Sequence, residues 1–153
     1  NLLKEKIPMQ VLIVGSGIEQ LNLKNYIEKN SLSKIVKITN FMSNPFRYMK
    51  QAELFILTSI YEGLPNVLLE AQGLKKFIIS SNCPTGPREI LLNGKAGFLF
   101  STGNEDQLSK KIFDYYKNKK KLNKMINLGY KNIDRFDSKK NLLKYYNLIN
   151  KYL

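Results

Sequence analysis

Short apolar runs alternate with amphipathic stretches along most of this chain, and this alternation limits the fold more than any other feature. The runs predict five strands, at residues 9–14, 34–41, 54–57, 76–80 and 97–100. Strands that alternate with helices are typical of parallel pairing, because each helix can supply the crossover that joins two parallel strands. The first apolar run is continuous, which predicts a strand buried on both faces. We therefore expect an α/β fold built on a parallel sheet.

Beyond residue 103 the pattern changes to helices alone. Asn104, Glu105 and Asp106 predict a helix start, with acids near the positive end of the helix dipole. Apolar side chains then recur at helical spacing in three groups: Leu108, Ile112 and Tyr115; Leu122, Met125, Ile126 and Ile133; Leu142, Tyr145, Tyr146, Ile149, Tyr152 and Leu153. The tyrosines share their stripes with Leu and Ile, so we expect them at the edge of the core. We expect one domain over residues 1–153, with the helical tail 104–153 packed on it.

The basic charge of the chain lies mostly in that tail. The net charge is +13, and residues 107–153 supply +10 of it. One interpretation is attraction to an anionic membrane surface or to phosphorylated substrates. The other is codon bias, since Lys, Asn, Ile and Tyr are all abundant, and the sequence leaves both open. We do not expect nucleic-acid binding, because the basic residues lack a recognition motif.

Composition excludes several kinds of chemistry. The chain contains no histidine, which removes the commonest general base, the commonest zinc ligand and every Ser-His or Cys-His nucleophile pair. It has no Asp-x-Asp pair and no His/Cys cluster, so we expect no metal. Cys83 is the only cysteine, which fits a reducing compartment and makes the cytoplasm the default location.

The glycine-rich turn after the first strand tests for a dinucleotide site. Gly15 and Gly17 follow the apolar run as in a Gly-x-Gly fingerprint. The third glycine position is Gln20, however, and no acid follows about 20 residues later to hold a ribose. We expect no nicotinamide or flavin cofactor here. A tight turn is the simpler interpretation, and proximity to a phosphate is the second.

Residues 54–71 predict a strand, a turn and a helix, with one acid on the turn and one on the helix. Glu62 lies on the turn and Glu70 two turns into the helix, while Pro65 suits a first helical position. Open parallel sheets bind ligands at the carboxyl ends of their strands, so both acids can face a ligand. Pattern alone equally allows an exposed turn acid and an acid on a polar helix face.

Residues 62–71, EGLPNVLLEA, resemble the E-x7-E motif of the group 1, family 4 retaining glycosyltransferases of the GT-B fold. Segments 14–17, 81–90 and 94–99 resemble other parts of that family, in its order and approximate spacing. The resemblance covers nearly the whole chain. It implies the carboxy-terminal, Rossmann-like half of a GT-B fold, a parallel sheet sandwiched by helices, with its first strand and helix missing.

The resemblance also implies roles for individual residues. Glu62 is then the catalytic-site acid that contacts hydroxyls of the transferred sugar, and Glu70 accepts hydrogen bonds from the ribose hydroxyls. The backbone amides of Gly63, Leu64 and Asn66 help to hold sugar or diphosphate oxygens. Gly15 and Gly17 border the nucleotide, and Asn40 lies where the family's chain passes the base.

The function implied is transfer of a hexose-type sugar from a nucleotide-sugar, with UDP as the expected nucleotide. The anomeric configuration of the sugar is then retained, and no metal or other cofactor is needed. The acceptor is expected to be a glycan or lipid-linked saccharide, bound through an amino-terminal domain absent from this sequence, so we expect the fragment to be inactive alone. The location implied is the cytoplasm, with possible contact at the inner face of the cell membrane. The alternative is a non-catalytic nucleotide-binding or protein-binding module of the same fold.

Overall fold

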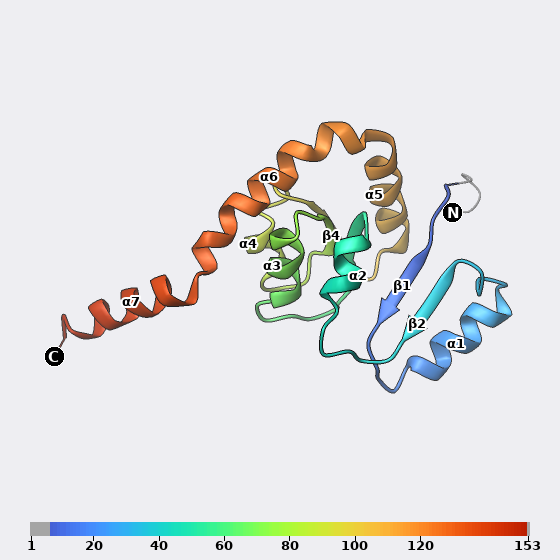
Figure 1. The fold of residues 1–153 in the computed structure, drawn as a ribbon, viewed down its shortest axis with the longest axis horizontal. Helices are drawn as coiled ribbons and strands as arrows, with labels where there is room; N and C mark the ends of the chain where they lie inside the picture. The colour runs from blue at the N-terminus through green and yellow to red at the C-terminus, as the bar shows by residue number, and fades with distance from the viewer. Residues whose placement is uncertain (1–6, 153) are drawn as a thin grey trace. The chain divides into compact units, whose positions relative to one another are not determined.

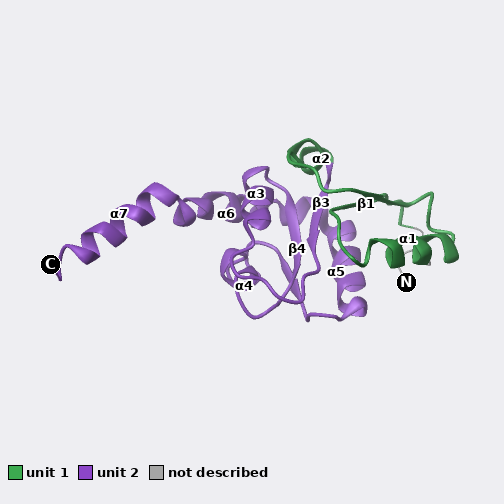
Figure 2. Ribbon diagram, turned by 90° about the horizontal axis from the view of Figure 1, so that it is seen from below, with its two compact units in different colours: residues 1–51 green, residues 52–153 purple. Residues whose placement is uncertain are grey.

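The structure is a computed structural model that describes residues 7–152 (Figure 1). The contacts within the chain divide it into two compact units, residues 1–51 and residues 52–153 (Figure 2). The expectation of one domain over residues 1–153 stays a prediction.

Unit 1 is a parallel strand pair joined by a helix. Its elements are β1 (Val11–Val14), α1 (Gln20–Lys29), β2 (Val36–Thr39) and α2 (Phe46–Gln51). The register of the pair runs from Val11 opposite Val36 to Val14 opposite Thr39. Helix α1 supplies the crossover that parallel strands need. Both strands lie within the stretches 9–14 and 34–41 that the sequence predicts as strands.

The prediction that the first strand is buried on both faces is wrong for this structure. Val11, Leu12 and Val14 are exposed, at 39%, 41% and 40% of their surface. Within the described part of unit 1, β1 has one neighbouring strand, β2. A continuous apolar run is compatible with burial on both faces, but burial requires elements that cover both faces.

Unit 2 contains a three-stranded parallel sheet in the order β3-β4-β5. The strands and their connecting helices are β3 (Leu54–Leu57), α3 (Asn66–Gly73), β4 (Phe77–Ser81), α4 (Pro87–Ile90) and β5 (Phe98–Phe100). All five residues of β4 are buried, as expected for a central strand covered on both faces. Parallel pairing in both units agrees with the alternation of strands and helices in the sequence.

The core of unit 2 forms where the sheet meets the helices that follow it. Buried Phe77, Ile79, Phe100 and Leu122 make its centre. The partly buried side chains around them come from β3, β5 and the following helices: Leu54, Phe98, Leu108, Ile112, Tyr115, Met125 and Ile126. Phe77 meets Phe98 edge-on and stacks on Tyr115, with ring centroids 4.9 and 5.0 Å apart.

The chain after the sheet is helical, as predicted. Its elements are α5 (Glu105–Asn118), the 3-10 turn η1 (Lys119–Leu122), α6 (Asn123–Asn132), the 3-10 turn η2 (Ile133–Phe136) and α7 (Ser138–Ile149). The side chain of Asn104 caps α5 by accepting a hydrogen bond from the amide of Gln107 at 2.9 Å. Asp137 caps α7 in the same way, through the amide of Lys140 at 2.8 Å. No helix within residues 7–152 is long and apolar enough to cross a membrane.

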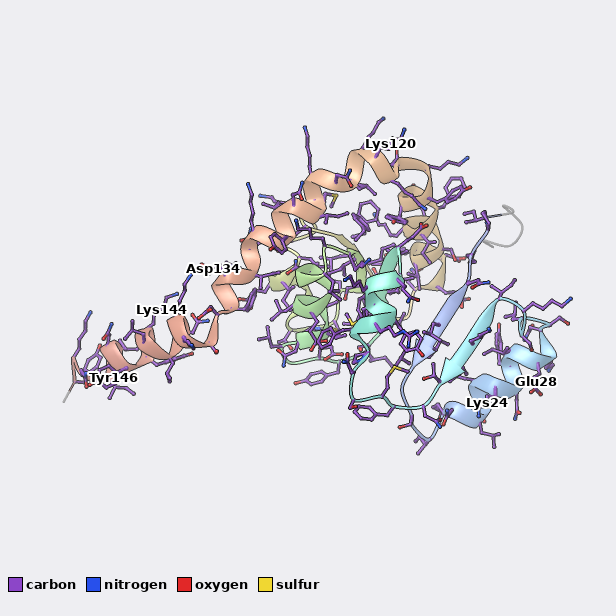
Figure 3. The ribbon with its side chains drawn as sticks, viewed as in Figure 1. Lys24, Glu28, Lys120, Asp134, Lys144 and Tyr146 are labelled. Atoms are coloured by element: carbon purple, nitrogen blue, oxygen red, sulfur yellow. The ribbon has the colours of Figure 1, made fainter. Side chains whose placement is uncertain are left out.

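The expectation that the apolar stripe of the last helix lies at the core edge is wrong for the described residues. Helix α7 has no buried residue, and Leu142, Tyr145 and Tyr152 are exposed at 70%, 66% and 84%. Tyr146 and Lys144 lie along this helix in Figure 3. The remaining predicted residue, Leu153, lies outside the described range. Amphipathic spacing shows which face a helix can bury, but it does not supply a partner for that face.

Candidate functional site

The candidate site in unit 2 is the turn between β3 and α3. Strand β3 ends at Leu57 and α3 begins at Asn66, so the turn is residues 58–65. Pro65 is the residue before the helix rather than its first residue, with φ −70° and ψ 92°. Its carbonyl accepts the first helical hydrogen bond, from the amide of Leu68 at 2.9 Å. The predicted position of Pro65 is therefore wrong by one residue, because its ψ angle is extended rather than helical.

Glu62 is partly buried on this turn and is held through two of its oxygens. The hydroxyl of Ser59 donates to carboxylate oxygen Oε1 at 2.7 Å. The hydroxyl of Thr85 donates to the backbone carbonyl of Glu62. No residue in the described part of the chain hydrogen-bonds the second carboxylate oxygen, Oε2. Glu62 thus has one oxygen fixed by the protein and one available to accept bonds from a ligand.

The loop after β4 braces the turn from the neighbouring strand. Ser81, at the end of β4, donates its hydroxyl to the backbone carbonyl of Ser59 at 2.6 Å. Gly86 has φ +86°, and a Cβ on this residue would come within 3.0 Å of the Gly63 carbonyl oxygen and of Pro65 Cδ. The two loops are in close contact because β3 and β4 are neighbours and their carboxyl ends meet at the same edge of the sheet.

Glu70 is partly buried on α3, eight residues after Glu62. Its carboxylate has no hydrogen bond to any residue between 7 and 152. Gly63, Leu64 and Asn66 are exposed, and a Cβ on Gly63 would meet nothing within 4 Å. The first amides of a helix have no partner within that helix, so this side of the turn offers both free N–H groups and open space.

The remaining candidates, Gly15, Gly17 and Asn40, belong to unit 1. Gly15 follows β1 with φ +147°, and its amide donates to the carbonyl of Thr39 at 3.2 Å. Asn40 follows β2, and its side-chain oxygen accepts a bond from Gln20 Nε2 at 2.9 Å. Gly15 and Asn40 therefore lie together at the carboxyl ends of two paired strands, and Gly17 lies on the turn into α1.

Other chemistry-bearing groups are sparse in the described chain. No group of three or more His, Cys, Asp or Glu side chains within residues 7–152 is arranged to hold a metal ion. Cys83 is buried, at 2% exposure. Arg88, which flanks the loop after β4, donates from Nε to Asn82 Oδ1 at 3.2 Å.

The sequence pattern did not identify the contacts of Glu62. Ser59 lies three residues before Glu62, and this spacing is a local signal that could have indicated the hydroxyl–carboxylate bond. Ser81 and Thr85 lie 22 and 23 residues from the groups that they contact. Such contacts arise from the pairing of β3 with β4, which fixes the register but is not visible as a motif.

Comparisons with known proteins find similarity to glycosyltransferases. WclY of Escherichia coli, an O-antigen biosynthesis glycosyltransferase, is 30% identical over 139 residues, which is 91% of this chain and 38% of that protein. The N-acetylgalactosamine-N,N'-diacetylbacillosaminyl-diphospho-undecaprenol 4-alpha-N-acetylgalactosaminyltransferase of Campylobacter jejuni is 28% identical over 125 residues, 76% of this chain and 34% of that protein. The chain therefore spans little more than a third of the length of these relatives.

The structure of HepE from Anabaena, determined in complex with UDP, is similar in fold. It matches with a TM-score of 0.82 and 20% sequence identity, over 97% of this chain and 43% of that one. This likeness confirms the predicted fold class, a Rossmann-like parallel α/β arrangement of the GT-B type with a helical carboxy-terminal stretch. The family model of the glycosyl transferases group 1 matches residues 1–132, and the chain therefore belongs to that family.

Proposed function

We propose that this chain binds the nucleotide-sugar donor of a retaining, family 4 glycosyltransferase. The observation that carries the proposal is the carboxylate of Glu62, which has one oxygen held by Ser59 and one oxygen open. It lies on a turn at the carboxyl end of a parallel strand, where open α/β sheets bind ligands. Glu70 follows eight residues later on α3, with its carboxylate unpaired among the described residues.

Each acid has a separate role in this proposal. Glu62 accepts hydrogen bonds from hydroxyls of the transferred sugar near the anomeric carbon. Glu70 accepts from the ribose hydroxyls, since an ionised carboxylate has two oxygens that suit a vicinal diol. The amides of Gly63 and Leu64 on the turn, and of Asn66 at the start of α3, hold sugar or diphosphate oxygens in this proposal.

For unit 1, considered by itself, we propose contacts with the nucleotide. Gly15 and Gly17 leave room for the nucleotide at the end of β1, because neither carries a Cβ and both hypothetical Cβ positions are open within 4 Å. Asn40 contacts the base of the nucleotide through its backbone groups in this proposal. In the structure its side-chain oxygen accepts a hydrogen bond from Gln20 Nε2, and its backbone carbonyl accepts one from the hydroxyl of Thr39.

The donor in this proposal is a UDP-linked hexose, and HepE, a protein of the same fold, was determined in complex with UDP. No metal or other cofactor takes part. The charge on the departing diphosphate is then offset by cations and helix-terminal amides, which are preorganised groups that need no reorganisation.

The acceptor in this proposal is a glycan or a lipid-linked saccharide. The names of WclY and of the Campylobacter enzyme, an O-antigen glycosyltransferase and a transferase acting on a diphospho-undecaprenol compound, support that class. Because those relatives are much longer, we propose that a second, amino-terminal domain binds the acceptor and that these 153 residues do not catalyse transfer alone. The enzyme would work in the cytoplasm, with residues 107–153, which carry a net +10, attracted to the anionic inner face of the membrane.

Calorimetric titration of the 153-residue chain with UDP, GDP and ADP tests the proposal. We expect UDP to bind, and Glu70→Ala to weaken its binding by roughly tenfold or more, the size of losing hydrogen bonds to a charged group. Glu28→Ala is the matched control, because it removes the same charge from an exposed position on α1 (Figure 3). Nucleotide binding that is unchanged by Glu70→Ala would favour a non-catalytic binding module instead, and no binding to any of the three would refute the donor site.

A further inference from the structure

Three hydroxyl groups converge on the turn that carries Glu62. Ser59 holds the carboxylate, Thr85 holds the backbone carbonyl of Glu62, and Ser81 holds the backbone carbonyl of Ser59. The first is on the turn itself, while the other two come from the end of β4 and the loop after it. We refer to Ser59, Ser81 and Thr85 as the hydroxyl brace.

Strand β4 shows that one hydroxyl of the brace is placed selectively. Ser80 and Ser81 are adjacent and both fully buried. Side chains of neighbouring strand residues point to opposite faces of a sheet. Ser80 donates to the carbonyl of Ser81 at 3.0 Å, whereas Ser81 donates to Ser59 at 2.6 Å. Only the second of these two serines therefore reaches the turn.

We propose that the hydroxyl brace positions Glu62 for recognition of the donor sugar, an inference that rests on the proposed function. Ser59 fixes the rotamer of Glu62 by bonding Oε1, and Oε2 is left to accept from a sugar hydroxyl. Ser81 and Thr85 fix the backbone on both sides of that contact. A carboxylate held in this way loses less side-chain freedom when the sugar binds.

The brace acts mainly on the carboxylate that contacts the sugar, and this makes its role testable. The affinity for UDP reports on the nucleotide part of the site. The ratio of the affinity for a UDP-sugar to the affinity for UDP reports on the contacts to the sugar. We refer to this ratio as the sugar increment. A residue that acts only on folding changes the unfolding temperature but leaves the sugar increment of the folded protein unchanged.

The experiment measures Kd by calorimetry on the 153-residue chain for UDP, UDP-glucose and UDP-N-acetylglucosamine, and uses the sugar nucleotide with the larger increment. We expect Ser59→Ala to reduce the increment by roughly tenfold while UDP affinity stays within twofold, because a hydrogen bond to a charged group is lost. Ser59→Thr keeps a hydroxyl at the same position and should restore the increment.

Ser81→Ala and Thr85→Val test the two contacts to the backbone. Both should reduce the increment by roughly threefold, a smaller effect than at Ser59 because each bonds a neutral carbonyl. Ser80→Ala is the matched control: it removes an equally buried hydroxyl from the adjacent position and should leave the increment unchanged. If Ser81→Ala does not fold, the comparison of Ser59→Ala with Ser59→Thr decides the proposal alone.

The outcomes separate this inference from the proposed function. A sugar increment that Glu62→Gln abolishes but Ser59→Ala leaves intact overturns the brace and keeps the donor site. Equal effects of Ser80→Ala and Ser81→Ala overturn the role of Ser81. If the wild-type chain binds no UDP, or if its increment is insensitive to Glu62→Gln, the proposed function fails and the brace fails with it.

Discussion

Replacing Gly86 with alanine should destabilise unit 2, because the new Cβ would clash with the loop that carries Gly63 and Pro65. Gly86 has φ +86°, and its new Cβ would come within 3.0 Å of the Gly63 carbonyl oxygen and of Pro65 Cδ. Its φ of +86° and ψ of −68° lie in a region that a residue with a Cβ rarely adopts, at a cost of about 1–3 kcal/mol, and overpacking costs about 1–3 kcal/mol, so we expect a loss of about 2–6 kcal/mol. In a chain of this size a loss of about 3 kcal/mol lowers Tm by roughly 6–12 °C.

Gly103→Ala separates the two contributions. Gly103 also has a positive φ, +75°, but a Cβ there would meet nothing within 4 Å. It should therefore show only the conformational cost, about 1–2 kcal/mol. Urea unfolding followed by circular dichroism gives both free energies of unfolding, and we expect the larger loss at Gly86, where the clash adds to the backbone cost. Equal losses for the two variants would show that the loops yield without resistance, and would refute the close packing described here.

Three further predictions follow from other contacts. In the helices, Gly129→Ala should lower the free energy of unfolding by about 1–3 kcal/mol, because its Cβ would lie 2.8 Å from Gln72 Nε2. Gly73→Ala, whose Cβ has its nearest contact at 3.9 Å, should raise it by about 0.5–1 kcal/mol. Urea unfolding measures both changes, and the same sign for both would contradict the reasoning. Asn104→Ala removes the cap of α5 and should cost about 1 kcal/mol by the same assay, so an unchanged stability would contradict the cap. Burial raises the pKa of Tyr115, and the charge of Lys119 partly offsets this. Tyr115 therefore ionises at a lower pH in the unfolded chain than in the folded one, so the free energy of unfolding should fall as the pH rises above about 10. An equal fall in a Tyr115→Phe variant would contradict this.

Local patterns predicted the elements of the fold well, because short apolar runs and helix caps depend on neighbouring residues. The run at residues 54–57 matches β3 at both ends, and α5 starts directly after its cap Asn104, within the predicted helix start. The errors concern burial. Val11, Leu12 and Val14 of β1 and the apolar residues of α7 are exposed in the described chain, since a sequence pattern shows which face can be buried but not whether another element covers it.

The candidate site divides in the same way. The strand, turn and helix that carry Glu62 and Glu70 were predictable because they form one contiguous segment. The hydrogen bonds from Ser81 and Thr85 were not, because they join residues 22 and 23 positions apart. The start of α3 shifted by one residue because Pro65 has an extended ψ, an angle that its ring does not determine.

The exposure of α7 also has a consequence for how the chain unfolds. A 12-residue helix that buries no side chain receives little stabilisation from packing, and isolated helices of that length are marginal in water. Its amides should therefore exchange with solvent through local fraying, while those of β4, where every residue is buried, should exchange only through much larger opening of unit 2. Hydrogen exchange would thus show two different opening free energies within unit 2, a small one for α7 and a large one for β4. On heating, α7 at the carboxyl end would unfold first.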